Sequence, residues 1–459
     1  MLFSSLPLSP PLLGNLDQIG YHAMTPIQAQ SLPPILERRD LIAQAKTGSG
    51  KTAAFGIGIL HKLNPSLFAV QALVLCPTRE LADQVSNELR RLARFAQNIK
   101  ILTLCGGAPM RPQIASLEHG AHVVVGTPGR IRDHIGRATI DLSRLHTLVL
   151  DEADRMVDMG FHEEIAGIVS ACPARRQTLL FSATYPDDIR KASAAFLTDP
   201  CEIKIEGQHG DDQIEQRFYE VGIDERNAAV ARLLKHYRPV SALAFCNTKI
   251  HCRELTDELR AQGVSALALH GDLEQRDRDE ILVLFANRSC SVLVATDVAA
   301  RGLDIQTLDA VINVDVAKDT EVHIHRVGRT GRGQEKGLAL SLCAPNERKW
   351  VRLIEEYQGA PVQWFELPPA DEADHDMLQA PMVTLCIMGG KKDKLRPGDL
   401  LGALTGDAGL TKEQVGKINV FEFMTYVALD RQIADKAYAR LSSGNIKGRN
   451  FKMRFISPT

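Results

Sequence analysis

Two short stretches of the sequence carry residue types that suit the binding and hydrolysis of a nucleoside triphosphate. The first is Ala45-Lys46-Thr47-Gly48-Ser49-Gly50-Lys51-Thr52 and the second is Asp151-Glu152-Ala153-Asp154. Glycines let successive backbone N–H groups point at phosphate oxygens, a lysine adds positive charge, and a threonine hydroxyl can bind Mg²⁺. A carboxylate after a strand can hold the same ion, and its neighbour can orient a water. Together the two stretches predict a nucleoside triphosphate hydrolase.

Both stretches come where an expected strand ends. An apolar run over 40–44 precedes the phosphate-binding loop and a helix-compatible run over 52–55 follows it, which is the strand-loop-helix order that the motif needs. The acidic stretch follows the short apolar run 147–150. The loop begins with Ala45 where the usual pattern has glycine, a small change that the backbone tolerates.

Near-continuous apolar runs bounded by Gly, Pro and Thr recur along the chain and are typical of parallel strands buried on both faces. In residues 1–207 they cover 72–76, 101–105, 122–126, 147–150 and 178–181, and in residues 208–360 they cover 242–246, 266–269, 291–295, 310–314 and 338–342. We therefore expect two α/β domains, each doubly wound around a parallel sheet. The polar, glycine-bearing stretch 206–213 is expected to link them.

The end of the chain differs in composition from the rest. A stretch with prolines and acidic residues over 361–380 predicts a second linker. Beyond it, residues 381–459 hold 13 Lys and Arg against 7 Asp and Glu, a net charge of +6, whereas the whole chain is at −2. The expected elements follow the order βαββαβ, a small α+β domain of the RRM type, but the usual RNP signature is missing. A polyanion is the expected partner, and we place its binding on basic loops at Lys391, Lys392, Lys394, Arg396 and Lys447.

The overall composition is that of an ordinary protein of two or three domains. The chain has 459 residues, 44% of them apolar and 24% charged, without an apolar run long enough to span a membrane or a secretory start. Its nine cysteines are scattered and never spaced as Cys-x-x-Cys, so we expect reduced thiols rather than zinc or disulfides. These features favour a cytoplasmic protein, and we expect it to be a monomer.

A dense basic stretch, His325-Arg326-Val327-Gly328-Arg329-Thr330-Gly331-Arg332, lies in the second expected domain. Arginines separated by glycines can reach a phosphate cluster on a neighbouring surface without steric cost. Because the triphosphate motifs of the first domain contain no arginine, we expect Arg329 and Arg332 to act as arginine fingers. Such an arrangement contributes about 10³ to 10⁵ in rate.

Over residues 3 to about 345 these motifs resemble those of the DEAD-box ATP-dependent RNA helicases. The ordered matches are Phe3, 20–28, 45–52, 77–80, 106–107, 127–130, 151–154 and 182–184, then 245–249, 275–278, 295–304 and 325–332. The resemblance implies two RecA-like domains, ATP as the nucleotide, Mg²⁺ as the ion, and RNA as the partner.

The resemblance also implies roles for the matching residues. Those expected to bind ATP are Tyr21, Gln28, Ala45, Lys46, Thr47, Gly48, Ser49, Gly50, Lys51, Thr52 and Asp304. Those expected in catalysis are Lys51, Asp151, Glu152, Arg329 and Arg332, with Thr52 and Asp151 holding Mg²⁺. Those expected to couple hydrolysis to domain closure are Asp154, Ser182, Thr184 and His325. Those expected to contact the RNA backbone are Arg79, Gly107, Thr127, Arg130, Thr248, Arg276, Thr296 and Gly302.

The basic tail resembles the C-terminal RNA-binding domain of the DbpA subfamily, chiefly over 389–398 and 444–448. That subfamily is associated with bacterial 23S rRNA and large-subunit assembly, so the resemblance implies a 23S rRNA hairpin, an adjacent duplex and pre-50S particles as partners. Two other interpretations remain. An ATP-gated RNA clamp without productive unwinding is disfavoured by the full set of hydrolytic residues, and a DNA helicase is disfavoured by the motif around Gln28.

Overall fold

The computed structural model describes the chain except for residues 46–47, 186–189, 191–193, 206–213, 301–307, 332–335, 370–377, 408, 447 and 457–459. It divides into two compact units that separate between His209 and Gly210, and each is described by itself. The expected interdomain linker 206–213 lies outside the described residues. None of the described helices is both long and apolar enough to cross a membrane.

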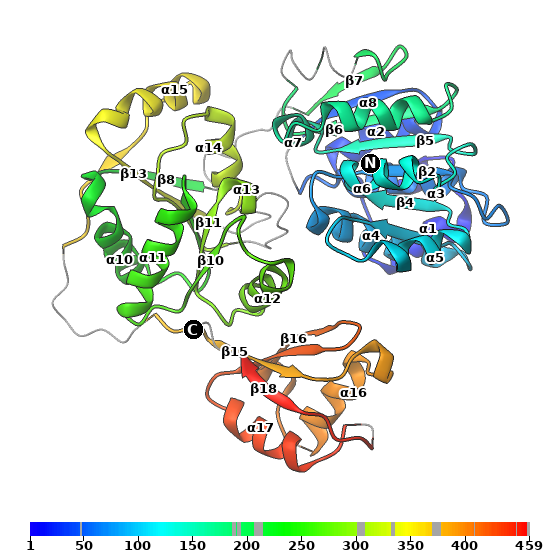
Figure 1. The fold of residues 1–459 in the computed structure, drawn as a ribbon. Coiled ribbons are helices and arrows are strands. Elements are labelled where there is room, and N and C mark those ends of the chain that lie inside the picture. The colour runs from blue at the N-terminus through cyan, green and yellow to red at the C-terminus, as the bar shows by residue number, and fades with distance from the viewer. Residues whose placement is uncertain are drawn as a thin grey trace. The chain divides into compact units, whose positions relative to one another are not determined.

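The first unit is built on a seven-stranded parallel sheet with the order β3-β4-β2-β5-β6-β1-β7 (Figure 1). Its strands are β1 (Leu41–Gln44), β2 (Ala72–Leu75), β3 (Ile101–Leu104), β4 (Val123–Gly126), β5 (Thr147–Asp151), β6 (Gln177–Ser182) and β7 (Cys201–Lys204). Its helices are α1 (Pro10–Gln18), α2 (Pro26–Leu36), α3 (Lys51–Lys62), α4 (Arg79–Leu92), α5 (Met110–Glu118), α6 (Pro128–Gly136), α7 (Ala153–Asp158) and α8 (His162–Ala171). The central strands are apolar and fully buried, as strands covered by helices on both faces must be.

The second unit begins with a similar parallel sheet of order β10-β11-β9-β12-β13-β8-β14. Its strands are β8 (Ile214–Glu220), β9 (Ala242–Cys246), β10 (Ala266–Leu269), β11 (Val292–Thr296), β12 (Ala310–Asn313), β13 (Gly337–Cys343) and β14 (Trp364–Phe365). Its helices are α10 (Arg226–Tyr237), α11 (Lys249–Ala261), α12 (Gln275–Ala286), α13 (Asp297–Ala300), α14 (Thr320–Val327) and α15 (Arg348–Gln358). The two doubly wound sheets confirm the expected fold class.

The sheets have more strands than the apolar runs predict. β7 alternates exposed polar and inward residues, β8 carries polar residues over 215–217, and β14 is only two residues long. All three lie towards one edge of their sheets. β14 falls within the stretch 361–380 that composition marks as a linker, and it pairs with β8 through Trp364 and Phe218. Part of that stretch therefore completes the second sheet.

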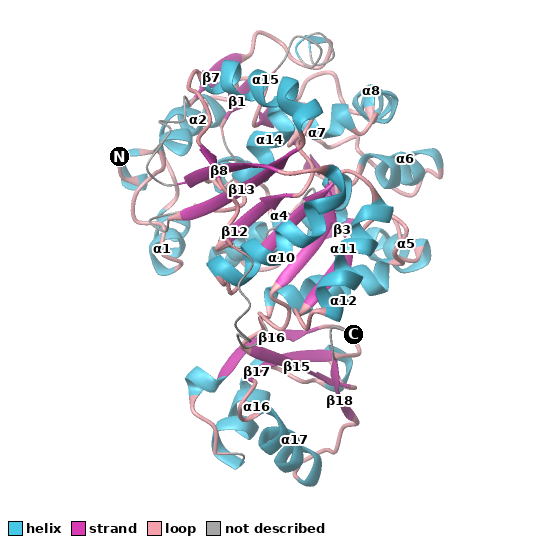
Figure 2. Cartoon of the chain, turned by 90° about the vertical axis from the view of Figure 1, so that its left-hand side faces the viewer, coloured by secondary structure: helices cyan, strands magenta, loops and turns pink. Residues whose placement is uncertain are grey.

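The C-terminal domain has a four-stranded antiparallel sheet of order β16-β17-β15-β18, with two helical segments on one face (Figure 2). The elements are β15 (Met382–Ile387), α16 (Pro397–Gly402) continued by a π-helical turn (Ala403–Asp407), β16 (Val415–Val420), β17 (Thr425–Asp430), α17 (Ala434–Ser443) and β18 (Met453–Ile456). This confirms the expected βαββαβ order. Leu385, Val427 and Leu429 are buried with the helices in the core of the domain.

Candidate nucleotide and RNA sites

Three expected nucleotide motifs meet at one end of the first sheet. The phosphate loop follows β1, Asp151 is the last residue of β5, and Ser182 is the last residue of β6. These strands are neighbours in the order β5-β6-β1 and run parallel. Since the carboxyl ends of parallel strands lie at the same edge, the motifs converge where ligands bind in open α/β sheets.

The Gln28 side chain connects the phosphate loop to the start of α2. Its side chain accepts a bond from the Thr25 amide at 2.9 Å and donates one to the Gly50 carbonyl at 3.1 Å. Gly50 has φ 96°, a left-handed conformation that glycine adopts without strain, and an added Cβ would collide with the Gln28 amide. The position therefore requires glycine, and Gln28 fixes the turn that starts α3.

The interior of the loop is polar. Lys51 is only 6% exposed, and its ammonium donates to the Ala45 carbonyl at 2.8 Å. The Ser49 hydroxyl is buried without a hydrogen-bond partner among the described residues. A buried ammonium and an unpartnered hydroxyl are what phosphate oxygens satisfy. Gly48 has φ 82°, whereas Lys46 and Thr47 of the same loop lie outside the described residues.

The acidic motif places two carboxylates in different surroundings. Burial raises the pKa of Asp151 to about 7, although the Lys51 ammonium lowers it. Glu152 has φ 55° and forms a buried ion pair with Arg155, 2.6 Å from Glu152 Oε2 to Arg155 Nη1. Left-handed backbone at a glutamate is uncommon and costs of order 1 kcal/mol or more. Residues strained in this way cluster at active sites, which supports a functional role for Glu152.

Asp154 joins the acidic motif to the Ser182-Ala183-Thr184 motif. Its Oδ2 accepts hydrogen bonds from the amides of Ala183 and Thr184, both at 3.0 Å, and from the Thr184 hydroxyl at 3.2 Å. The Asp154 amide in turn donates to Ser182 Oγ at 3.2 Å. The two motifs are therefore locked together by bonds to a carboxylate, which are stronger than neutral ones.

Tyr21 and Thr52 occupy the remaining expected nucleotide positions of the first unit. The half-buried Tyr21 donates to Glu88 at 2.8 Å and packs edge-on against Phe3. Burial and the neighbouring Glu88 raise the pKa of Tyr21, so it stays a neutral phenol. Thr52 is half-buried in the first turn of α3. Its hydroxyl and the Asp151 carboxylate offer the hard oxygen ligands that Mg²⁺ prefers, so the residues fit that ion.

The RNA candidates of the first unit lie beside the nucleotide motifs. Arg79 starts α4 after β2, Gly107 follows β3, and Thr127 and Arg130 follow β4, and these strands form the continuous half β3-β4-β2 of the sheet. A Cβ on Gly107, which has φ 77°, would overlap the Arg79 guanidinium. Arg130 donates to Gln113 at 2.9 Å and to the Ala108 carbonyl at 3.0 Å. The structure therefore brings these four residues to one edge.

The second unit repeats this arrangement. Thr248 follows β9, Arg276 lies in the first turn of α12 after β10, and Thr296 ends β11. The strands are adjacent in the order β10-β11-β9. Thr248 and Arg276 are exposed and Thr296 is half-buried, whereas Gly302 lies outside the described residues. Exposed hydroxyl and guanidinium groups at a common edge suit a sugar-phosphate backbone.

The basic stretch of the second unit contains an anchor that sequence reasoning missed. Arg326 is buried, donates two bonds of 2.7 Å to Asp297, and bonds the Asp315 carbonyl at 2.6 Å. Its guanidinium also lies 5.1 Å from the Phe245 ring centroid. Arg326, Asp297 and Phe245 belong to separate motifs that are far apart in the sequence. No local pattern therefore predicts their contact, which is seen only in the folded structure.

Two of the expected finger and coupling residues lie close to Arg326 in the chain. Arg329 is 5% exposed and follows α14, and the half-buried His325 lies within α14. Arg332 and Asp304 lie outside the described residues. The roles expected of these four residues stay predictions.

Among the described residues, one group of three His, Cys, Asp or Glu side chains is spaced closely enough to hold a metal ion, namely Cys246, His251 and Asp315. Asp315 already forms an ion pair with the buried Arg226, which also pairs with Glu347. Burial, with Asp315 nearby, raises the pKa of the Cys246 thiol far above its usual range. A protonated thiol and a paired carboxylate indicate a structural ion network rather than a metal centre.

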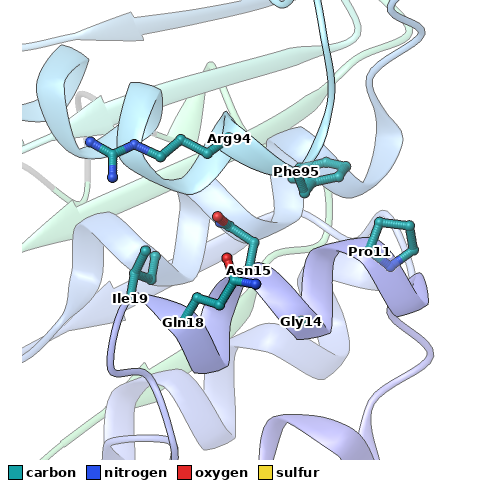
Figure 3. A pocket seen from close by; sticks show the side chains of 7 residues that line it. All are labelled: Pro11, Gly14, Asn15, Gln18, Ile19, Arg94 and Phe95. Carbon is teal, nitrogen blue, oxygen red and sulfur yellow. The ribbon is translucent and has the colours of Figure 1, made fainter.

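A hollow of the first unit lies between α1 and the turn Ala93–Phe95 (Figure 3). It is lined by Pro11, Gly14, Asn15, Gln18, Ile19, Arg94 and Phe95. The Asn15 amide is bonded to the Leu92 carbonyl at 2.9 Å. None of these residues belongs to an expected nucleotide or RNA motif.

The basic loop of the C-terminal domain runs from β15 to α16. Lys391, Lys392, Lys394 and Arg396 are all exposed there. Lys394 adopts φ 60° where a short 3₁₀ turn ends. Lys447, expected on the second basic loop, lies outside the described residues.

Three family models match the chain in order. The DEAD/DEAH box helicase model matches residues 25–192, the helicase conserved C-terminal domain matches 225–334, and the DbpA RNA binding domain matches 384–455. These matches cover the central strands of both sheets and most of the tail domain. The chain therefore belongs to the DEAD-box ATP-dependent RNA helicases.

Comparison with individual proteins narrows the class. The chain is 53% identical over 455 residues, 99% of each chain, to ATP-dependent RNA helicase DbpA of Escherichia coli. It is 43% identical over 81% of its length, and 79% of the relative's, to DEAD-box helicase CshA of Geobacillus kaustophilus. The structure of S. cerevisiae Dbp5 bound to RNA and ADP BeF3 is similar with a TM-score of 0.74 and 30% identity, covering 81% of this chain and 97% of that one. The chain is a member of the DbpA subfamily.

Proposed function

We propose that this ATP-dependent RNA helicase separates short duplexes in structured 23S rRNA during large-subunit assembly, held in place by its C-terminal domain on a nearby rRNA hairpin. The observation that carries the proposal is the joining of a complete helicase core to a domain of net charge +6 that matches the DbpA RNA binding domain. Pre-50S particles are the corresponding assembly, with ATP and Mg²⁺ as substrate and ion.

The nucleotide chemistry follows from the first unit. Phosphate oxygens accept hydrogen bonds from the Lys51 ammonium, which now donates to the Ala45 carbonyl, and from the Ser49 hydroxyl, which has no partner among the described residues. Glu152 orients the attacking water, and its ion pair with Arg155 fixes the position of the carboxylate. Thr52 and Asp151 would hold Mg²⁺, which would supply positive charge beside the phosphates. Tyr21 and Gln28 select adenine from the other side of the loop.

Coupling to RNA follows from Asp154. Its three hydrogen bonds to Ala183 and Thr184 make the acidic motif and the segment 182–184 move together. Arg329, Arg332, Asp304 and His325 of the second domain complete the site when RNA holds both domains. The two domains bind one RNA strand in a conformation that an A-form duplex cannot adopt, and this separates the local base pairs. Hydrolysis of ATP then releases the strand.

The alternative is an ATP-gated clamp that holds RNA without unwinding it. A strand-displacement assay separates the two, using a short duplex placed beside 23S rRNA fragments. The helicase function requires ATP-dependent release of the short strand, whereas a clamp shows ATP-dependent binding without release.

ATPase stimulation tests the choice of RNA. We expect stronger stimulation by a 23S rRNA transcript than by a 16S rRNA transcript of equal length or by single-stranded DNA. A Lys391→Glu and Lys392→Glu double variant should lose the preference while retaining turnover at saturating RNA, and Lys235→Glu on α10 serves as a control for a charge reversal elsewhere on the surface. Equal stimulation by all three nucleic acids contradicts the 23S assignment.

A further inference from the structure

One face of the C-terminal sheet is covered by the second unit's own parallel-sheet domain. On β15, Leu385 and Ile387 point to the helices, so Thr384 and Cys386 point to the opposite face, and both are fully buried. The Thr384 hydroxyl bonds Asn287 Nδ2 at 3.1 Å and Ser289 Oγ at 2.7 Å, and the Met382 amide donates to the Arg288 carbonyl at 3.2 Å. Residues at the end of α12 therefore close this face.

RNA must meet the domain elsewhere. Domains with this strand order commonly stack bases on aromatic side chains of the open sheet face. Here the residues on that face include Thr384 and Ala428, which cannot stack, and its aromatic Tyr426 is itself buried. Exposed aromatic rings lie instead at an edge of the sheet.

Two such rings lie at the turn between β16 and β17. Phe421 is 44% exposed and Phe423 is 61% exposed. Phe421 packs edge-on against Tyr426, with ring centroids 5.7 Å apart at 83°, which restrains the orientation of its ring. The Lys392 ammonium lies 4.4 Å from the Phe423 ring centroid and 3.6 Å from the Glu422 carboxylate. Aromatic faces and ammonium groups are thus presented together.

The aromatic turn and the basic loop form one rigid surface. The amides of Lys391 and Lys392 donate to the carbonyls of Phe421 at 2.9 Å and Glu422 at 3.1 Å. The Thr425 hydroxyl donates to the Gly389 carbonyl at 2.7 Å. A Cβ on Gly390 would collide with the turn backbone, so the close approach requires glycine. Rigid aromatic groups bind at low entropic cost.

We propose that the surface formed by the Phe421–Met424 turn and the Lys391–Lys392 segment is a stacking site for an unpaired RNA base, with the two lysines contacting its phosphates. Stacking on an aromatic ring and salt-screened contacts to phosphate are the two components of single-strand recognition. The site lies within residues 384–455, which match the RNA-binding model. It deepens the proposed function by naming what the domain recognises, a base free of its helix in a hairpin loop.

Equilibrium binding with the full-length protein tests the site. The probes are a fluorescently labelled 23S rRNA stem-loop, a 16S rRNA stem-loop of equal loop size, and a blunt RNA duplex of equal length. Phe423→Ala should raise the Kd for the 23S stem-loop about 5- to 100-fold, the range of one lost base stack, and leave the Kd for the duplex unchanged. Phe423→Tyr should retain binding, because it keeps the aromatic face. Tyr357→Ala, at an equally exposed ring on α15, is the matched control.

The outcomes separate this site from the choice of rRNA. If wild type binds both stem-loops equally and Phe423→Ala weakens both, the stacking site stands and the 23S assignment fails. If wild type prefers the 23S stem-loop and Phe423→Ala binds it as tightly, the stacking site is wrong. A change in self-association measured by sedimentation, without a change in RNA affinity, assigns the turn to a protein contact instead and also overturns it. A 2-aminopurine base in the loop gives a second readout, since stacking on Phe423 changes its fluorescence.

Discussion

The Asp154 carboxylate accepts two hydrogen bonds from Thr184, one from its amide at 3.0 Å and one from its hydroxyl at 3.2 Å. Asp154 lies in the first turn of α7, which follows β5, and Thr184 follows the neighbouring strand β6. These two hydrogen bonds link the motif expected to hydrolyse ATP to the segment 182–184, which is expected to couple hydrolysis to domain closure. ATP hydrolysis and RNA unwinding can therefore be tested separately by changing this link.

Thr184→Ala should uncouple hydrolysis from unwinding. The substitution removes the hydroxyl bond but leaves both amide bonds to Asp154, so the motif stays folded. Loss of one hydrogen bond to a charged group weakens the link by about 1.5–3 kcal/mol. We expect RNA-stimulated ATP turnover to remain and strand displacement to fall about tenfold or more. Thr184→Ser is the control, and equal loss of both activities contradicts the coupling role.

Lys51→Ala should abolish ATP turnover. The Lys51 ammonium is buried in the loop and donates to the Ala45 carbonyl, so alanine at this position removes a cation that is already placed for the phosphates. A loss of about a hundredfold or more is expected from removing one transition-state contact of this kind. Steady-state ATPase measurements check this, with Lys235→Ala as control, and near-normal turnover refutes the phosphate-loop assignment.

Glu152→Gln should stop hydrolysis while ATP and RNA remain bound. Glutamine is isosteric and its amide oxygen can still accept from Arg155, which is 2.6 Å from the present carboxylate. Only the negative charge that activates the water is removed. Filter binding with ATP and RNA, beside a turnover assay, gives the answer. Weak ATP binding by the variant instead assigns Glu152 a structural role.

The second parallel-sheet domain should depend on pH through His251. Its Nδ1 faces Asp315 at 3.1 Å and its Nε2 faces Asn227 Oδ1 at 3.0 Å, so both ring nitrogens have acceptors and the imidazolium is favoured. The hydrogen bond to Asp315 raises the pKa of His251, while burial lowers it. Because the folded-state pKa is raised, the stabilisation is full below the unfolded value of about 6.5 and is lost as pH rises through the folded-state value.

Thermal unfolding of His251→Gln against wild type measures this contribution. The difference in Tm should be larger at acidic than at alkaline pH and should shrink between them. His236→Gln, at an exposed histidine on α10, should show no such trend. A difference that grows with rising pH contradicts the ion-pair account.

Thr384→Val should loosen the docking of the C-terminal domain. The substitution leaves Asn287 and Ser289 buried without their partner. An unsatisfied buried polar group costs about 1–3 kcal/mol. Urea unfolding followed by fluorescence measures the loss, and Thr384→Ser, which keeps the hydroxyl, should behave as wild type. An unchanged midpoint for both variants contradicts a role for this contact in docking.

The sequence predicted the central strands well because they are buried on both faces and read as unbroken apolar runs. It missed β8, whose Glu215, Gln216 and Arg217 reflect a position near the sheet edge. It identified the motif residues through local patterns such as the glycine-rich loop. It did not identify Arg326, because partners such as Asp297 and Asn247 are brought to it only by the fold. Likewise, the stretch 420–427 lacked the expected aromatic signature, and only the structure shows that its rings lie on a turn beside the lysines.

The strand order of the first sheet has one more implication. β5, which ends in the ATP motif, is the immediate neighbour of β2, which leads to Arg79, with Leu150 paired to Leu75. Neighbouring strands lie about 5 Å apart. A structural change caused by ATP hydrolysis therefore has to be transmitted over only one strand spacing to reach the surface expected to bind RNA. No long chain of side-chain contacts is needed.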